Sequence, residues 1–267
     1  MLKITTIQTD LHWENKEANL RMFENKLIHL VEPTEIVVLP EMFSTGFSMQ
    51  PEKLAEEMDG ESVNWMKEQS AKHRIILTGS LIIKEDNKFY NRLLWVLPNG
   101  QLGYYDKRHL FGFAGEDQFY TPGNKRLIAS VKGWRVNLQV CYDLRFPAWT
   151  RQRLQKNEAG ELSPEYDVLI YVANWPERRS HAWKTLLCAR AIENQCYVVG
   201  VNRVGDDGNL IHHSGNSMVI DPLGEVLYHM AEEEDVFTIT LQKEHLESVR
   251  TRFPFWKDGD NISLNNH

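Results

Sequence analysis

The chain has 267 residues, of which 42% are hydrophobic and 25% are charged, so a large buried core is expected. The formal net charge of −7 argues against a general nucleic-acid-binding protein, because such proteins usually carry a basic surface. No apolar run approaches the roughly 20 residues of a membrane helix, and the sequence contains no repeat or linker, so we expect one domain over residues 1–267 and no membrane partner.

In the first half of the chain, short apolar runs alternate with stretches of helical periodicity. A helix begins after the Asp59-Gly60 break, and Pro98-Asn99-Gly100 is a strong turn between two strands. In order, the pattern predicts a strand at 2–9, a helix at 14–31, a strand at 35–40, a helix at 61–72, and strands at 74–83, 88–97 and 101–106.

The second half shows the same alternation, and a loop with Gly160 and Pro164 interrupts it at 157–165. The polar segment from about Lys257 is expected to be a disordered tail or an arm on a partner subunit. In order, the pattern predicts strands at 126–131 and 134–140, a helix at 147–155, a strand at 167–173, a helix at 180–194, strands at 196–201, 216–220, 225–229 and 235–240, and a helix at 242–251. Strands and helices that alternate at both ends of a chain, with hairpins between, indicate sheets covered by helices in an α/β domain.

Three chemically complementary side chains follow three of the predicted strands directly. Glu41 follows the apolar run 36–40, Lys107 follows 102–106, and Cys141 follows the run that ends at Val140. A side chain at the end of a buried strand is held rigidly and can still reach a cleft. A thiol, a carboxylate and an ammonium placed in this way can serve as nucleophile, base and oxyanion stabiliser.

Each of these residues also has a structural interpretation. Most free cysteines are buried packing residues, which is the role expected for Cys188 and Cys196. Lys107 stands among charged residues and has the context of a surface lysine. Glu41 emerges from an apolar run, so we expect it to be partly buried and to work as a base, although it could also cap a turn. Glu116 could orient Lys107 or the attacking water, or be an ordinary loop acid.

Other catalytic layouts fit less well. His109 is the only histidine near Lys107 for a Cys–His pair, and the adjacent His212 and His213 would point to opposite faces of a strand. The sequence has no H-E-x-x-H, Walker or G-x-G-x-x-G pattern, so neither a metal nor an organic cofactor is expected. The three cysteines form no disulfide framework, and the N-terminal segment lacks the apolar core of a signal peptide, which together favour a cytoplasmic protein.

Taken together, the motifs around Glu41, Lys107 and Cys141 resemble the catalytic triad of the nitrilase, or carbon–nitrogen hydrolase, superfamily, over almost the whole chain. Further segments are similar to the omega-amidase group, and Glu116 falls where the superfamily places a second active-site glutamate. The segments that carry this second similarity are residues 43–48, 171–176, 190–195 and 202–205.

The resemblance implies an α-β-β-α sandwich, with two sheets packed face to face, and pairing of subunits into a homodimer or higher oligomer. It also implies that Glu41 accepts the Cys141 proton and that Cys141 forms a thioester. Lys107 and the backbone N–H of Tyr142 would hold the oxyanion.

An omega-amidase would release ammonia from the terminal amide of a short 2-oxo acid, such as 2-oxoglutaramate or 2-oxosuccinamate. Its small-molecule substrate carries a distal carboxylate, and arginines are candidates to bind that group. Arg145 could instead brace the Cys141 turn. Aromatic residues could wall the pocket. The residues considered for these roles are Arg145, Arg178 and Arg179, and Phe43, Phe113 and Trp175.

Three other functions remain open on the sequence. An N-carbamoyl amino-acid amidohydrolase, or another small aliphatic amidase, would use the same triad on a different substrate. A non-catalytic scaffold would keep the fold without turnover. In a thiol redox sensor, Cys141 would be oxidised reversibly, but the spacing of the cysteines shows no resolving cysteine.

Overall fold

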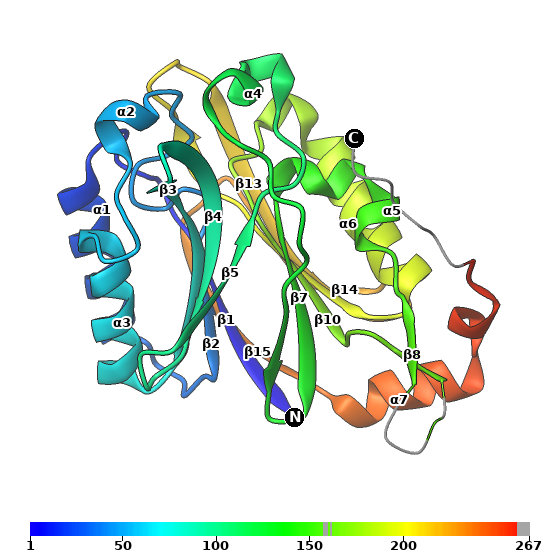
Figure 1. Ribbon diagram of the computed structural model, residues 1–267. Helices are drawn as coiled ribbons and strands as arrows, with labels where there is room; N and C mark the ends of the chain where they lie inside the picture. The colour runs from blue at the N-terminus through cyan, green and yellow to red at the C-terminus, as the bar shows by residue number, and fades with distance from the viewer. Residues whose placement is uncertain (157–159, 161, 261–267) are drawn as a thin grey trace.

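The computed structural model describes residues 1–156, 160 and 162–260, which form two large sheets packed face to face between two layers of helices (Figure 1). The first sheet has the strand order β15-β1-β2-β3-β4-β5, in which β1, β2 and β3 run parallel. Its strands are β1 (Leu2–Gln8), β2 (Ile36–Val38), β3 (Ile76–Glu85), β4 (Lys88–Val96), β5 (Leu102–Asp106) and β15 (Asp235–Leu241).

The second sheet has the strand order β12-β13-β11-β10-β7-β6, and β14 also pairs with β13. Its centre is parallel, because β10 pairs in parallel with both β7 and β11. Its strands are β6 (Ile128–Val131), β7 (Trp134–Val140), β10 (Val168–Val172), β11 (Tyr197–Val201), β12 (Val204–Asp206), β13 (His212–Ile220) and β14 (Val226–Ala231).

Helices cover the outer faces of both sheets. The long helices α1 and α3 lie on the first sheet, and α6 lies on the second (Figure 1). The helices are α1 (Lys16–Ile28), α2 (Pro51–Leu54), α3 (Glu61–His73), α4 (Glu116–Phe119), α5 (Pro147–Thr150), α6 (Ser180–Asn194) and α7 (Lys243–Arg252). Short 3₁₀ turns are η1 (Gly112–Ala114), η2 (Cys141–Arg145), η3 (Glu177–Arg179) and η4 (Phe255–Asp258). Within the described residues, none of the helices has the length and apolarity needed to cross a bilayer.

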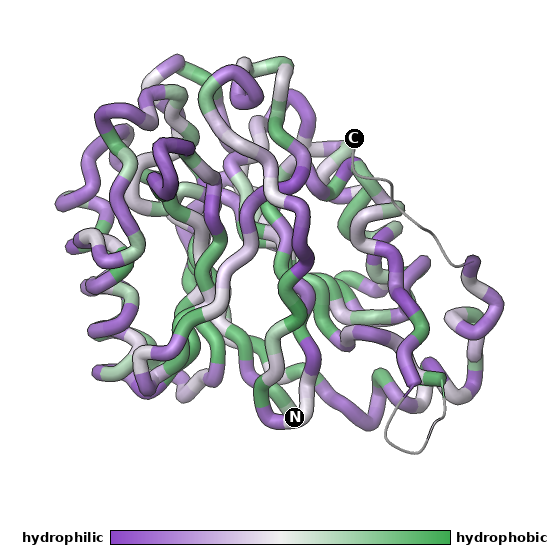
Figure 2. The backbone as a smooth tube through the Cα atoms, in the orientation of Figure 1, coloured by the Kyte–Doolittle hydropathy of each residue, from purple (hydrophilic) through white to green (hydrophobic). Residues whose placement is uncertain are grey.

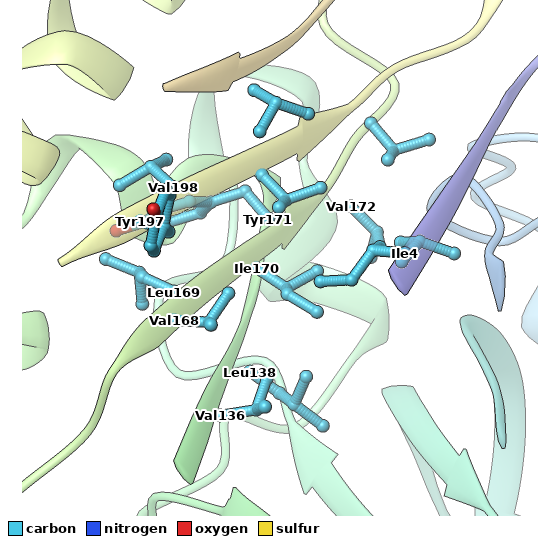
Figure 3. Close-up of a cluster of buried hydrophobic side chains, with 14 of the residues drawn as sticks. Ile4, Val136, Leu138, Val168, Leu169, Ile170, Tyr171, Val172, Tyr197 and Val198 are labelled. Carbon is cyan, nitrogen blue, oxygen red and sulfur yellow. The ribbon is translucent and has the colours of Figure 1, made fainter. Parts of the chain in front are cut away.

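The central strands β10 and β11 consist of aliphatic, tyrosine and glycine residues, because both of their faces are covered. Every residue of β10 is buried, and its side chains pack with those of the neighbouring strands β7 and β11 (Figure 3). A second cluster fills the space between the first sheet and helices α1 and α3. Figure 2 shows the result as apolar strands inside and more polar helices outside. The expected α-β-β-α sandwich is therefore confirmed.

One predicted helix is too long. The helix expected at 147–155 ends at Thr150, because hydrogen bonds from elsewhere in the fold bind the next residues in an extended conformation. The Gln152 side chain exchanges hydrogen bonds with the backbone of Tyr166, and its backbone N–H donates to Asn194 Oδ1 at 2.9 Å.

The segment predicted as a loop at 157–165 is also partly wrong. The short strands β8 (Leu154–Lys156) and β9 (Leu162–Pro164) pair on either side of it. Residues 157–159 and 161 lie outside the described residues. Of the predicted tail from about Lys257, residues 261–267 also lie outside them.

Candidate active site

Glu41, Lys107 and Cys141 meet where the two sheets pack together. Glu41 lies three residues beyond β2, Lys107 directly follows β5, and Cys141 directly follows β7, so two side chains come from the first sheet and one from the second. Glu41 is 0% exposed, Lys107 1% and Cys141 8%. Lys107 is therefore not the surface lysine that its charged neighbours suggested.

Lys107 lies between two carboxylates. Its ammonium donates to Glu41 Oε1 at 2.9 Å and to both carboxylate oxygens of Glu116, at 3.0 and 2.8 Å. Glu116 is fully buried at the start of α4 and also accepts a hydrogen bond from the Phe111 N–H at 2.6 Å. Glu41 and Glu116 thus hold the Lys107 ammonium together, and Glu116 binds it through both of its carboxylate oxygens.

Two asparagines fix the Glu41 carboxylate. Asn91 Nδ2 donates to Glu41 Oε1 at 2.8 Å and to Glu116 Oε1 at 3.2 Å, so it bridges the two acids. The backbone N–H of Asn174 donates to Glu41 Oε2 at 2.8 Å, and its side chain donates to the Glu41 carbonyl at 2.6 Å. Both asparagines are site residues to which the sequence analysis gave no role.

Cys141 occupies a strained turn. Its φ is +44°, in the left-handed region that non-glycine residues rarely adopt, and η2 begins at this residue. The backbone N–H groups in the first turn of a helix have no acceptor within the helix. The N–H of Tyr142, the residue after Cys141, is one of these groups.

The charges in this cluster favour a protonated thiol at rest. Burial, and then the negative charge of Glu41, raise the pKa of the Cys141 thiol well above its ordinary value, although Lys107 opposes this shift. Burial disfavours the charged form of Lys107, but Glu116 and Glu41 outweigh it and raise the pKa of the ammonium. Burial raises the pKa of Glu116, whereas Lys107 lowers it. The charge of Glu41 acts directly on the thiol, so this carboxylate is close enough to accept its proton.

A buried carboxylate joins the Cys141 turn to the Lys107 loop. Asp143 Oδ2 accepts hydrogen bonds from the Tyr105 hydroxyl at 2.8 Å and from the Val140 N–H at 3.1 Å. Asp143 Oδ1 accepts from the backbone N–H and ring Nδ1 of His109. His109 therefore orients a neighbour of the cluster instead of pairing with Cys141.

A cavity of about 240 Å³ opens above Cys141. Of the five residues predicted to contact a substrate, Phe43 does not line the cavity. The other four do: Tyr142, Trp175, Phe113 and Arg145. Phe43 is fully buried in the core beneath the first sheet, with its ring 5.5 Å from that of Phe23 in an edge-to-face arrangement. Its prediction as a pocket residue is wrong, because it follows Glu41 on the side of the chain that packs against α1 and α3.

The other side chains around the cavity are mainly aromatic and cationic. Arg178 and Arg179 line it together with Arg145, as do Phe47, Phe111, Asn174, Asp207, Ile211 and His213. His213 is buried and His212 is exposed, which confirms the expected opposite orientations. Among the described residues, no group of three or more His, Cys, Asp or Glu side chains is arranged to hold a metal ion.

The chain is similar to enzymes that act on carbon–nitrogen bonds. The profile of the carbon–nitrogen hydrolase family matches residues 3–251. Omega-amidase YafV from Escherichia coli (strain K12) is 42% identical over 267 residues, which cover 98% of each chain. The 2-oxoglutaramate amidase of Bacillus subtilis (strain 168) is 30% identical over 258 residues, which cover 96% of each chain. The crystal structure of XC1258 from Xanthomonas campestris, described as a CN-hydrolase superfamily protein with an arsenic adduct in the active site, has a TM-score of 0.95 and 45% identity, with 99% of each chain covered.

Proposed function

The chain belongs to the carbon–nitrogen hydrolase family, and from this premise we propose that it is an omega-amidase that cleaves the terminal amide of short 2-oxo acid amides, such as 2-oxoglutaramate and 2-oxosuccinamate. The observation that carries the proposal is the buried Glu41–Lys107–Cys141 cluster at the base of a small cavity with cationic walls. A cavity of about 240 Å³ is smaller than the roughly 300 Å³ at which pockets for drug-sized ligands begin, which supports a short substrate.

In the first half of the reaction, Glu41 accepts the thiol proton as Cys141 Sγ bonds to the amide carbonyl carbon. The oxygen becomes an oxyanion, which the positive charge of Lys107 and the Tyr142 N–H stabilise. Glu41 then returns the proton to the amide nitrogen, the C–N bond breaks, and ammonia leaves. A thioester remains on Cys141.

In the second half, Glu41 accepts a proton from water as the water oxygen attacks the thioester carbonyl. The C–S bond breaks, the carboxylic acid is released, and Cys141 is protonated again through Glu41. The same carboxylate therefore acts as base and acid in both halves. Glu116 keeps Lys107 charged and in place, and the balanced reaction consumes one water and releases one ammonia.

Ammonia release from matched amides tests this proposal. We expect purified protein to release ammonia from 2-oxoglutaramate and 2-oxosuccinamate, and much more slowly from glutamine. An N-carbamoyl amino acid is offered in parallel as the substrate of the alternative amidohydrolase. Turnover of the carbamoyl compound alone would exclude the omega-amidase, and no ammonia from any of these compounds would favour a protein without turnover.

We also propose that the single domain forms a homodimer through one of its faces. We further propose that the enzyme is cytoplasmic. Exposed apolar side chains support the pairing, because they gather where the end of α6 meets the β13–β14 turn: Ile192, Leu223, Val226 and Leu227. Free thiols at all three cysteines support the reducing compartment. Sedimentation tests the pairing: Ile192→Asp should give monomers, whereas Val31→Asp, at an exposed residue after α1, should not.

A further inference from the structure

Three arginines line the active-site cavity without an acidic partner. Arg145, Arg178 and Arg179 make no ion pair with any residue in the part of the chain that the structure describes. Asp207 is the single acidic residue among the described side chains around the cavity, and it pairs with none of them. A cluster of unpaired cations at the wall of a pocket is stabilised by an anionic ligand.

Of the three arginines, Arg179 alone is half-buried. Its backbone N–H donates to the Pro176 carbonyl at 3.0 Å, and its own carbonyl accepts from Trp175 Nε1 at 2.8 Å. Its guanidinium carbon lies 5.0 Å from the centre of the Phe111 ring. By contrast, Arg145 and Arg178 are exposed, although Arg145 lies over the Trp175 ring.

The contacts of Phe111 connect Arg179 to the reacting groups. The Phe111 N–H donates to Glu116, which in turn binds Lys107, so the ring that supports Arg179 belongs to the loop that positions the ammonium. The electrostatics agree with this proximity. Burial and the positive charge of Arg178 lower the pKa of Arg179, whereas a Cys141 thiolate raises it, so the guanidinium lies within electrostatic reach of the thiol.

We propose that Arg179 is the specificity-determining residue that binds the substrate carboxylate remote from the amide. The inference rests on the proposed amidase function and names the group that selects its substrate class, the monoamides of short dicarboxylic acids. A guanidinium presents a planar fork of donors that matches both oxygens of a carboxylate, which an ammonium cannot do. The small cavity limits the number of carbon atoms between that carboxylate and the amide carbon beside Cys141.

Two amides of equal chain length test the role of Arg179. Succinamate carries the distal carboxylate, and butyramide has a methyl group in its place. Arg179→Gln should lower kcat/KM for succinamate by about 10- to 100-fold, mainly through KM, because a hydrogen bond to a charged group is lost. The same change should alter kcat/KM for butyramide by less than about 3-fold, and Arg179→Lys should recover part of the loss.

Arg21→Gln is the matched control, since it removes the same charge from an exposed arginine on α1 that does not line the cavity. It should change kcat/KM for both amides by less than about 3-fold. An equal loss of both activities in Arg179→Gln would assign the arginine a structural role. No loss for succinamate, or an equal loss in Arg21→Gln, would also overturn the inference.

Binding without turnover separates this inference from the proposed function. Calorimetry with the Cys141→Ala protein measures the affinity for succinamate, and the Cys141→Ala/Arg179→Gln protein should bind it at least about 10-fold more weakly. If the wild-type protein releases no ammonia from any amide, the proposed function fails, while this comparison still decides the role of Arg179. Equal affinities, or no saturable binding to either protein, would overturn the inference.

Discussion

Asp143 accepts hydrogen bonds from both the backbone N–H and the ring Nδ1 of His109, at 2.9 and 2.8 Å. Asp143 lies two residues after Cys141, and His109 lies two residues after Lys107. One buried carboxylate therefore fixes the distance between the turn that carries the thiol and the loop that carries the ammonium.

We predict that Asp143→Asn lowers kcat by about 10- to 100-fold, with a smaller change in KM. The amide presents an NH₂ group to N–H donors that had a carboxylate oxygen as acceptor, and a buried unpaired donor costs about 1–3 kcal/mol of folding free energy. Steady-state kinetics and thermal unfolding measure the two effects. Asp86→Asn, in the exposed β3–β4 turn, is the control and should leave both unchanged. Wild-type kcat in Asp143→Asn would show that the contact with His109 does not position the site.

Cys141→Ala should reduce turnover by at least about 10³-fold, because loss of the nucleophile removes the thioester route. Mass spectrometry of wild-type protein quenched during turnover should show an acyl group on the peptide that contains Cys141. Cys188→Ala, on the outward-facing helix α6, is the matched control and should keep full activity. An acylated residue other than Cys141 would contradict the assignment.

Glu41→Gln and Glu116→Gln should differ in severity. Glu41 faces the thiol and carries its proton, so its amide should lower kcat by about 10²- to 10⁴-fold. Glu116 acts through Lys107, and we expect a loss of about 10- to 100-fold when one of the two carboxylates that bind the ammonium becomes neutral. Single-turnover measurements compare the chemical steps. A greater loss in Glu116→Gln would exchange the roles of the two acids.

Phe43→Leu and Trp175→Leu should separate stability from substrate binding. Phe43 packs in the core, so Phe43→Leu should lower the free energy of unfolding by about 1–3 kcal/mol and leave KM unchanged. Trp175 lines the cavity, so Trp175→Leu should raise KM for the amide. Denaturant titration and steady-state kinetics on both variants check this. A raised KM in Phe43→Leu would show that Phe43 contributes to substrate binding after all.

The adjacent histidines should give opposite pH dependences of stability. Burial lowers the pKa of His213 to about 4, so its unfolded form binds a proton that the native form does not. Its contribution is present above pH ~6.5 and is lost as the pH falls towards 4, by on the order of 3 kcal/mol. Hydrogen bonds to Asp206 and Glu232 raise the pKa of His212, so its contribution is present below pH ~6.5 and is lost as the pH rises through the native pKa.

Unfolding measured from pH 5 to pH 8 checks these signs in His213→Gln and His212→Gln. The stability difference between wild type and His213→Gln should shrink towards acid pH. For His212→Gln it should shrink towards alkaline pH. The same slope in both variants would contradict the burial of His213.

The sequence predicted those site residues that stand just after a buried strand, because strand periodicity shows where the buried run ends. Lys107 and Cys141 directly follow such strands, and Glu41 follows the apolar run that contains β2, so their positions depend on local pattern alone. Asn174 lies two residues beyond β10 and carries the same signal, but its hydrogen bonds to Glu41 join residues 133 positions apart. Asn91 was missed because it lies inside a strand, where only the unusual burial of a polar side chain marks it.

The errors have a common physical cause in contacts between distant segments. Residues 151–155 have helical spacing, yet the hydrogen bonds of Gln152 with Tyr166 and Asn194 outweigh that local preference. Phe43 is close to Glu41 along the chain, but its side chain packs against helix α1. Periodicity identifies buried residues without stating which layer covers them.

The thiol belongs to one sheet, and its acid and ammonium belong to the other. The rate of turnover therefore depends on close packing between the two sheets. Hydrostatic pressure or mild denaturant should loosen the packing between the two sheets. Activity should then be lost while the hydrogen bonds between strands within each sheet remain. Inactivation would then precede the loss of secondary structure. The difference in pressure or denaturant concentration between the two transitions would measure how far the sheets can separate before they unfold.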